Sequence, residues 1–184
     1  MSRLPTPASI EASPAAAQPL LQAVQKQLGV VPNLFRLVGN SPAALEGYLG
    51  LNGALAKGAL EGPTRERIAL AVAEVNGCGY CLAAHTYLGR HLAKLDDAEI
   101  TANRNGASND PKADAAVRFA VKVARERGHV SEADFAAVKA AGYSEAQVIE
   151  IVVHVALNTW TNYFNEAFQT DVDFPVVAPQ RAAA

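Results

Sequence analysis

Alanine occupies 37 of the 184 positions in this chain, about a fifth, and it recurs along the whole sequence. Alanine has the highest helix propensity of the natural residues, whereas valine, isoleucine and aromatic residues at the alternating spacing of strands are scarce here. Half of the residues are hydrophobic, which is enough to form a core in a chain of this length. We therefore predict an all-α fold in a single domain.

Helix-start and helix-stop signals divide the chain further. Ser41, Thr64, Ser131 and Ser144 are typical N-caps, each placed before a stretch with apolar residues at helical spacing. Prolines punctuate the first 14 residues and the segment that follows Asp171. We predict an extended arm over 1–14, a single helical domain over 15–184 with a short proline-punctuated tail, and helices over about 20–28, 42–58, 64–75, 78–92, 96–102, 112–127, 131–141 and 144–168.

The charged residues argue against two classes of binding protein. Sixteen basic and 18 acidic side chains give a net charge of −2, and the basic residues form no cluster. Proteins that bind nucleic acid or anionic membranes concentrate positive charge on one surface. No apolar stretch approaches the roughly 20 residues that cross a bilayer, and the N-terminal residues lack the apolar centre of a signal peptide. We therefore predict a cytoplasmic protein with no nucleic-acid or membrane partner.

The chain has two cysteines, Cys78 and Cys81, and a histidine, His85, follows them closely. At 100° per residue these three side chains share one face of a helix. If Gly77 breaks the preceding helix, Cys78 lies at a helix N-terminus, where unpaired N–H groups and the helix dipole favour a thiolate. A thiolate attacks an electrophile, a second thiol resolves the sulfenic acid to a disulfide, and an imidazole transfers the proton. The segment therefore predicts redox chemistry.

Other interpretations of the cysteine segment stay open at this stage. Cysteine is often a small buried hydrophobic residue without chemistry. Cys78, Cys81 and His85 are three candidate zinc ligands, but a closed structural site needs four, and the chain has no second cysteine pair. A thioredoxin-like motif follows a strand, which the sequence does not predict. We favour redox chemistry that uses no metal and no other cofactor.

An acidic residue is expected to assist the imidazole, and two candidates precede it. In one unbroken helix, Glu74 would share the face of Cys78 and His85. In the same helix Glu66 would lie about 120° away from that face. A break at Asn76–Gly77 would remove the advantage of Glu74, because Glu66 could then approach from a folded-back helix. The local spacing favours Glu74 only if the helix is continuous.

The residues from Arg65 to His85 resemble a known family. Glu66 is followed by eleven residues, by the motif Cys78-Gly79-Tyr80-Cys81, by three residues and then by His85. This pattern resembles that of the AhpD-like alkylhydroperoxidases of the carboxymuconolactone decarboxylase superfamily. The similarity extends loosely over residues 20–177, where the flanking features resemble those of peroxidase-related proteins.

The resemblance implies a fold, an activity and a role for each residue. The fold would be an all-helical bundle that assembles into trimers or hexamers. Cys81 would attack hydrogen peroxide or an organic hydroperoxide, and Cys78 would then close a disulfide with it. Glu66 and His85 would relay protons, so the family pattern favours Glu66 over Glu74. An external dithiol would reduce the disulfide.

One position departs from the family pattern. The best-known members have a histidine directly before the second cysteine, where this chain has Tyr80. A phenol with an ordinary pKa of about 10 cannot act as a base at neutral pH, although it can donate a hydrogen bond. Tyr80 is therefore expected either to donate a hydrogen bond in the site or to pack at an interface.

The activity that we predict is that of a thiol-dependent peroxidase, an antioxidant oxidoreductase. The alternatives are a redox-sensing oligomeric protein without significant turnover and a general disulfide reductase. The decarboxylase branch of the superfamily does not use this cysteine pair, so its reaction is disfavoured. His154, on the aliphatic face of the last helix, is expected to be a hydrogen-bonded structural residue. Asn162 and Asn165 are expected to satisfy buried or interface partners.

Overall fold

The structure is a computed structural model that describes residues 1–180, and helices are the regular secondary structure of this part of the chain. The all-α prediction is confirmed. Residues 181–184, the end of the predicted tail, lie outside the described residues. A short 3₁₀ helix and the α-helices follow one another as η1 (Ala15–Ala17), α1 (Gln18–Leu28), α2 (Asn33–Val38), α3 (Pro42–Leu55), α4 (Gly62–Val75), α5 (Gly79–His91), α6 (Asp97–Arg104), α7 (Pro111–Arg125), α8 (Glu132–Ala140) and α9 (Glu145–Phe168).

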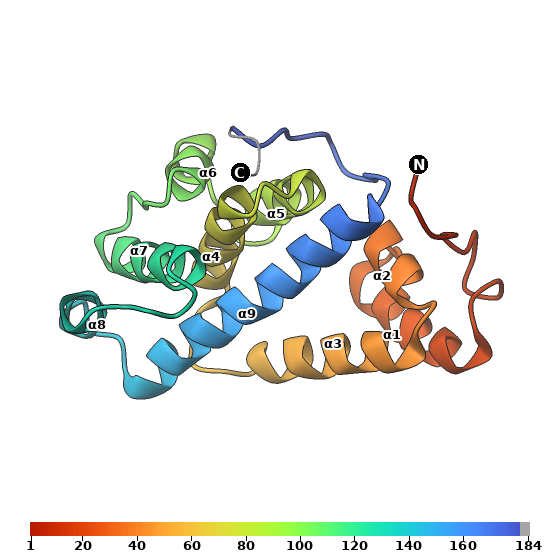
Figure 1. The fold of residues 1–184 in the computed structure, drawn as a ribbon, viewed down its shortest axis with the longest axis horizontal. Helices are drawn as coiled ribbons and strands as arrows, with labels where there is room; N and C mark the ends of the chain where they lie inside the picture. Colours follow the sequence, from red (N-terminus) through yellow and green to blue (C-terminus); the bar gives the residue numbers. More distant parts are fainter. Residues whose placement is uncertain (181–184) are drawn as a thin grey trace.

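The longest of these helices, α9, crosses the molecule from one end to the other (Figure 1). Its 24 residues span about 36 Å at 1.5 Å per residue. α4 packs against α9 and also against α5, α6 and α7, which makes it the central helix of the bundle. Figure 1 shows α4 to α8 on one side of α9 and α1 to α3 on the other. The molecule is therefore two helical groups that share α9.

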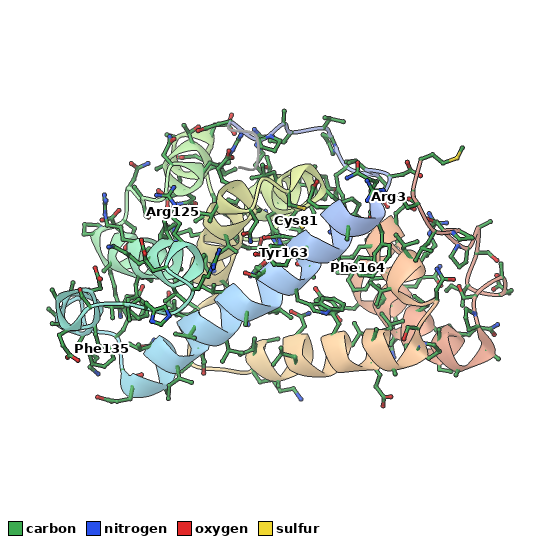
Figure 2. All side chains as sticks on the ribbon, in the orientation of Figure 1. Arg3, Cys81, Arg125, Phe135, Tyr163 and Phe164 are labelled. Carbon is green, nitrogen blue, oxygen red and sulfur yellow. The ribbon has the colours of Figure 1, made fainter. Side chains whose placement is uncertain are left out.

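Two main clusters of buried side chains form the core. One fills the space between α4, α7, α8 and α9 and includes Ile68, Phe119 and Ile151. The other joins α5 to α1, α2 and α3, and it contains both cysteines together with Leu21 and Leu45. The cysteines therefore lie where the two helical groups meet, and Figure 2 shows Cys81 near the middle of the molecule.

A sharp turn between α4 and α5 folds the two helices back against each other. Asn76 ends α4, and Gly77 follows with a φ of 67°, a left-handed conformation that glycine adopts without steric cost. Cys78 then caps the start of α5. The break that the sequence indicates at Asn76–Gly77 is present, so α4 and α5 form a hairpin rather than one continuous helix.

The predicted helix boundaries are correct in part. Ser41, Ser131 and Ser144 each accept a hydrogen bond from a backbone N–H in the first turn of a helix, as predicted. Thr64 is not an N-cap, because α4 begins earlier, at Gly62. Proline is tolerated in the first turn of a helix, so the Gly-Pro pair opens α4 instead of separating it from α3.

The short helix α2 is absent from our prediction. Its six residues, Asn33–Val38, are too few to show a helical period, and Pro32 before them is typical of a connection. The tail that follows α9 crosses α5 (Figure 1), where Asp173 accepts hydrogen bonds from the Asn33 N–H and the Tyr80 hydroxyl, each at 2.8 Å. Among residues 1–180, no helix combines the length and the apolar character that a membrane span requires.

Candidate functional site

The two cysteines lie at the start of α5, where the helix N-terminus meets the buried core. Cys78 is the N-cap residue, and its Sγ accepts the backbone N–H of Cys81 at 3.3 Å. Cys78 is fully buried, and Cys81 is only 3% exposed. Both are free thiols. This one-turn separation at a helix N-terminus is the arrangement that the Cys-x-x-Cys spacing predicts.

The surroundings of Cys81 favour its thiolate. A hydrogen bond from the Cys78 thiol, the positive charge of His85 and a hydrogen bond from Nδ2 of Asn165, at 3.2 Å, together outweigh the effect of burial. They lower the pKa of Cys81 from 9.0 to about 7. The pKa of Cys78 is raised, because its thiol donates to Cys81 and is itself buried. Cys81 is therefore the nucleophile of the pair and Cys78 its protonated partner.

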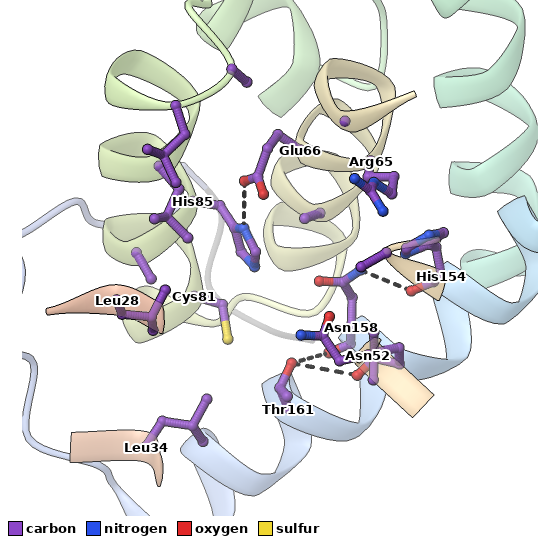
Figure 3. Close-up of a pocket in the computed structure, with 18 of the residues that line it drawn as sticks. Leu28, Leu34, Asn52, Arg65, Glu66, Cys81, His85, His154, Asn158 and Thr161 are labelled. Carbon is purple, nitrogen blue, oxygen red and sulfur yellow. Dashed lines mark hydrogen bonds and ion pairs between the residues drawn. The ribbon is translucent and has the colours of Figure 1, made fainter. Parts of the chain in front are cut away.

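Glu66 and His85 form an ion pair across the α4–α5 hairpin. Oε2 of Glu66 lies 2.8 Å from Nδ1 of His85. Burial lowers the pKa of His85, but the Glu66 carboxylate and the nearby Cys81 thiolate raise it more, so the net shift is upward. Figure 3 shows the imidazole between Glu66 and the sulfur of Cys81, on the wall of a cavity. The ring can therefore carry a proton between that cavity and the carboxylate.

The cavity has a volume of about 400 Å³ and lies between α4, α5 and α9 on one side and α1, α2 and α3 on the other. Glu66, Cys81 and His85 line it, whereas Cys78 lies behind Cys81 and does not. The Sγ atom of Cys81 points into this space (Figure 3). A small electrophile in the cavity can therefore reach Cys81, and Cys78 is placed to attack Cys81 afterwards.

Glu74, the alternative acid that we considered, faces another part of the molecule. Its carboxylate pairs with Nε of Arg104 at 2.8 Å and accepts the backbone N–H of Gln180 at 2.6 Å. Because the chain turns at Gly77, Glu74 cannot follow the helical face of the cysteines. It is a half-buried structural residue that holds α6 and the tail against α4.

The hydroxyl of Tyr80 forms its hydrogen bonds with α2 and with the tail. It accepts the N–H of Leu34 at 3.1 Å and donates to Oδ1 of Asp173 at 2.8 Å. Its ring packs edge-on against Phe174. Burial raises the pKa of Tyr80 further above its ordinary value. Tyr80 therefore anchors the tail as a neutral phenol, and both hydrogen-bond partners of its hydroxyl are outside the cysteine pair.

Metal binding finds no support in the geometry. Across residues 1–180, no group of three histidine, cysteine, aspartate or glutamate side chains is arranged to hold an ion. The third nearby ligand of the zinc alternative, His85, is instead paired with Glu66.

Comparison with known proteins relates part of the chain to a family. Residues 42–126 match the model of the carboxymuconolactone decarboxylase family. The fold is similar to that of a peroxidase-related protein from Ralstonia eutropha whose structure is described as an alkylhydroperoxidase AhpD core. The two are 26% identical, with a TM-score of 0.83 over 94% of this chain and 92% of the other. The chain therefore has an AhpD-like fold, and its residues 42–126 resemble the carboxymuconolactone decarboxylase family.

Other solved structures share the AhpD-like fold. A peroxidase-related protein from Silicibacter sp. is 24% identical, with a TM-score of 0.80 over 92% of this chain and 91% of the other. The debrominase Bmp8 is 20% identical, with a TM-score of 0.75 over 94% of this chain and 91% of the other. At these identities the likeness shows the fold alone. No curated protein sequence matches the chain.

The family match covers α3 to α7 and therefore the four predicted site residues, but α9 lies outside it. This AhpD-like chain takes two further features of the cavity region from α9. Asn165 donates to Cys81, and His154 lines the cavity with its Nε2 atom buried and without a partner in residues 1–180. The sequence predicts a hydrogen-bonded His154, but the Nε2 atom of its ring has no hydrogen-bond partner in residues 1–180.

A sequence signal for these α9 residues does exist. Buried polar residues recur at helical spacing along an otherwise aliphatic helix, and they form one polar stripe that faces α4 and α5. Its members are His154, Asn158, Thr161, Asn162 and Asn165.

Proposed function

We propose that this AhpD-like protein is a thiol-dependent peroxidase that reduces hydrogen peroxide or small organic hydroperoxides. The observation that carries the proposal is the position of Cys81, a buried thiol of low pKa that opens into a cavity beside a Glu66–His85 pair. Cys78, with its raised pKa, lies within reach as the second thiol. The likeness to the peroxidase-related protein from Ralstonia eutropha supports the same reaction.

In the first step the Cys81 thiolate attacks the terminal oxygen of the hydroperoxide. The S–O bond forms as the O–O bond breaks, and the leaving alkoxide takes a proton from His85, giving an alcohol and a sulfenic acid at Cys81. Glu66 stabilises the imidazolium before this transfer, because its carboxylate holds Nδ1 at 2.8 Å. The peroxide gains two electrons and the sulfur loses them.

In the second step Cys78 resolves the sulfenic acid. Its sulfur attacks Sγ of Cys81, the hydroxyl group leaves as water, and a Cys78–Cys81 disulfide forms. The proton released by the Cys78 thiol returns through the site to the leaving hydroxyl. An external dithiol then reduces the disulfide by thiol–disulfide exchange and is itself oxidised to a disulfide, which completes the cycle.

The experiment that tests this proposal is consumption of tert-butyl hydroperoxide with a dithiol reductant. We expect turnover in the wild type, none above the reductant background in Cys81→Ser, and at most one oxidation per chain in Cys78→Ser without disulfide formation. Ser2, which does not line the cavity, provides a control as Ser2→Ala. Unchanged turnover in Cys81→Ser would overturn the proposal.

Two alternatives are separated by the same assay. A general disulfide reductase must bring a protein disulfide to its cysteines, and the burial of both cysteines argues against that. Faster reduction of insulin than of hydroperoxide would favour it. A redox sensor would oxidise once, turn over slowly and change its assembly on oxidation.

A second electrophile is worth testing because one structural neighbour, Bmp8, is a debrominase. A cysteine-to-alanine variant of Bmp8 was solved in complex with 2,3,4-tribromopyrrole, and that chain is 21% identical to this one with a TM-score of 0.77 over 94% of this chain and 93% of the other. A thiolate accepts a bromine from an activated ring by the same two-electron attack that takes an oxygen from a peroxide. Bromide release from this pyrrole faster than peroxide consumption would replace the peroxidase proposal.

We also propose that the protein assembles with copies of itself, as the family resemblance implies. Exposed apolar side chains form a stripe along α9, and the stripe consists of Ile149, Val152, Trp160 and Tyr163. Figure 2 shows Tyr163 on the face of α9 that looks away from the bundle. An apolar stripe along a long helix is typical of a surface that packs against another helix.

A further inference from the structure

The cavity has a second polar region that the peroxidase chemistry does not use. Figure 3 shows Arg65 and His154 on the side of the cavity opposite Leu28 and Leu34, with Cys81 between the two sides. Arg65 comes from the first turns of α4 and His154 from the middle of α9. The cavity therefore has a cationic side, an apolar side and a nucleophile.

Arg65 presents a positive charge that no carboxylate neutralises among the described residues. The ion pairs within residues 1–180 use Arg67, Arg90, Arg104 and Arg118, but not Arg65. Its one hydrogen bond to the protein in that part of the chain runs from Nη1 to the carbonyl of Leu55, at 2.9 Å. A half-buried guanidinium with donors left over is costly to maintain unless a ligand pairs with it.

His154 adds a second donor beside Arg65. The side chain is 5% exposed, and its Nε2 atom is buried with no partner in residues 1–180. Burial and the charge of Arg65 lower the pKa of His154 to about 4, so the ring is neutral at pH 7. A neutral imidazole donates one N–H, and an unpaired buried donor is unfavourable until something accepts it.

Neither nearby carboxylate is free to serve as the acceptor. Glu66 is paired with His85 at 2.8 Å. Glu150, one turn before His154 on α9, accepts the backbone N–H groups of Ala59 and Leu60 at 2.8 and 2.7 Å. The anion that Arg65 and His154 would bind must therefore come from a ligand.

We propose that Arg65 and His154 bind the carboxylate of the substrate, so that the substrate class is an organic hydroperoxide that carries a carboxylate group. This proposal rests on the proposed peroxidase function and narrows it. The hydroperoxide end lies at Cys81, and the hydrocarbon between the two ends packs against Ala69 of α4 and Leu157 of α9, both of which line the cavity. The carboxylate thus fixes the distance and direction of the O–O bond.

A carboxylate fits this region better than a phosphate does. The planar guanidinium of a single arginine matches the two oxygens of a carboxylate. A phosphate ester carries up to two negative charges, and the cavity already holds the Glu66 carboxylate and the Cys81 thiolate. The hydroperoxide group itself stays neutral, so one new negative charge enters and one unpaired arginine receives it.

The first test measures binding and needs no turnover. Calorimetry with the reduced wild-type protein at pH 7.5 would compare 4-isopropylbenzoate with its neutral amide, 4-isopropylbenzamide. We expect the acid to bind about tenfold or more tightly, the range of a charge-assisted hydrogen bond. Arg65→Met should abolish this preference, Arg65→Lys should keep part of it, and Arg118→Met, an exposed arginine of α7, should keep all of it.

The same variants control for folding. Arg65→Met also loses the hydrogen bond to Leu55, so its helical circular dichroism must match the wild type. If it does not fold, His154→Leu and Arg65→Lys carry the test, and each should reduce the preference for the acid. Equal binding of acid and amide by the wild type would overturn the proposal. An undiminished preference for the acid in both the Arg65 and the His154 variants would overturn it as well.

The second test is kinetic and separates this proposal from the peroxidase proposal. It compares kcat/KM for para-carboxycumyl hydroperoxide and para-carbamoylcumyl hydroperoxide in the wild type, Arg65→Lys and Arg118→Met. We expect the acid to be preferred about tenfold by the wild type and by Arg118→Met, and less by Arg65→Lys. Equal turnover of both peroxides would leave the peroxidase standing and remove the carboxylate site. Arg65-dependent binding of the acid without turnover of either peroxide would leave the carboxylate site standing and remove the peroxidase.

Discussion

The imidazole of His85 and the carboxylate of Glu66 meet at 2.8 Å although 19 residues separate them in the chain. The turn at Gly77 makes this contact, because it folds α5 back along α4 and brings the two side chains to the same depth of the hairpin. The pair lies on the wall of the cavity into which Cys81 points. The charge on His85 therefore depends on Glu66, and the thiolate of Cys81 depends on both.

Replacing Glu66 with glutamine should slow peroxide reduction strongly. The carboxylate raises the pKa of His85, and the imidazolium lowers the pKa of Cys81, so Glu66→Gln removes both effects. We expect kcat/KM for tert-butyl hydroperoxide to fall by about 10²–10⁴, the range for losing a general acid or base. Glu74 lies in the same helix but outside the cavity, so Glu74→Gln should lower kcat/KM far less. Equal losses in the two variants would contradict the role of Glu66.

The pH dependence of thiol reactivity should report the pKa of Cys81. Because this pKa is lowered to about 7, the thiolate fraction rises through pH 7 instead of pH 9. Iodoacetamide alkylation of Cys81, followed by mass spectrometry, should therefore show a midpoint near pH 7. Asn165→Leu removes the hydrogen bond at 3.2 Å and should move the midpoint upward. A wild-type midpoint near 9 would contradict the proposed activation.

How far the sequence could predict this site depends on how far apart along the chain the contacting residues lie. Cys78, Cys81 and His85 lie within two turns of one helix, and helical spacing alone places them together. Glu66 required the break at Gly77, which the sequence signals only as an Asn-Gly pair. Helical spacing by itself pointed to Glu74, and the resemblance to AhpD-like proteins pointed to Glu66. The structure places Glu66, and not Glu74, beside His85.

The contributions of α9 could not be predicted, because they depend on how two distant helices pack. Asn165 lies 84 residues after Cys81, and no local rule connects them. Likewise, His154 and Arg65 meet in one cavity only because α9 crosses α4. Helix type and most N-caps were predictable because they follow from propensity and local hydrogen bonding, whereas α2 was too short to show a period.

Removing the Tyr80 hydroxyl should weaken the attachment of the tail. Tyr80→Phe removes the hydrogen bond from the N–H of Leu34 and one of the two that the carboxylate of Asp173 accepts. We expect the free energy of unfolding to fall by about 1–3 kcal/mol, measured by urea denaturation. If the hydroxyl instead acted on the thiolate, the alkylation midpoint of Cys81 would move as well. A shifted midpoint without any loss of stability would contradict the structural role.

Glu99 should make the fold sensitive to acid. Burial raises the pKa of this side chain, but hydrogen bonds from Ser108, Asn103 and Arg67 outweigh it and lower the pKa from 4.5 to about 2. A folded-state pKa below the unfolded value stabilises the fold above pH 4.5, and this contribution is lost as the pH falls toward 2. The shift corresponds to about 3 kcal/mol. Urea denaturation of wild type and Glu99→Gln should differ at pH 7 and converge toward pH 2. A constant difference would contradict the assignment.

The α9 stripe should hold copies of the chain together. Ile149 is 64% exposed and Tyr163 is 63% exposed, and both lie on the outer face of one helix. A charge placed on each would be buried without a partner at a helix–helix contact, which is strongly unfavourable. We therefore expect the double variant Ile149→Glu/Tyr163→Glu to be monomeric in light scattering. The wild type should have three or six times the chain mass of 19.3 kDa.

Phe135 provides the matched control for that experiment. It is also an exposed large apolar residue, 44% exposed, but it belongs to α8 at the end of the molecule (Figure 2). Phe135→Glu should leave the assembly unchanged, because it adds the same charge outside the stripe. A monomeric wild type at micromolar concentration would remove the oligomer proposal. Dissociation caused by Phe135→Glu but not by the double variant would move the interface from α9 to α8.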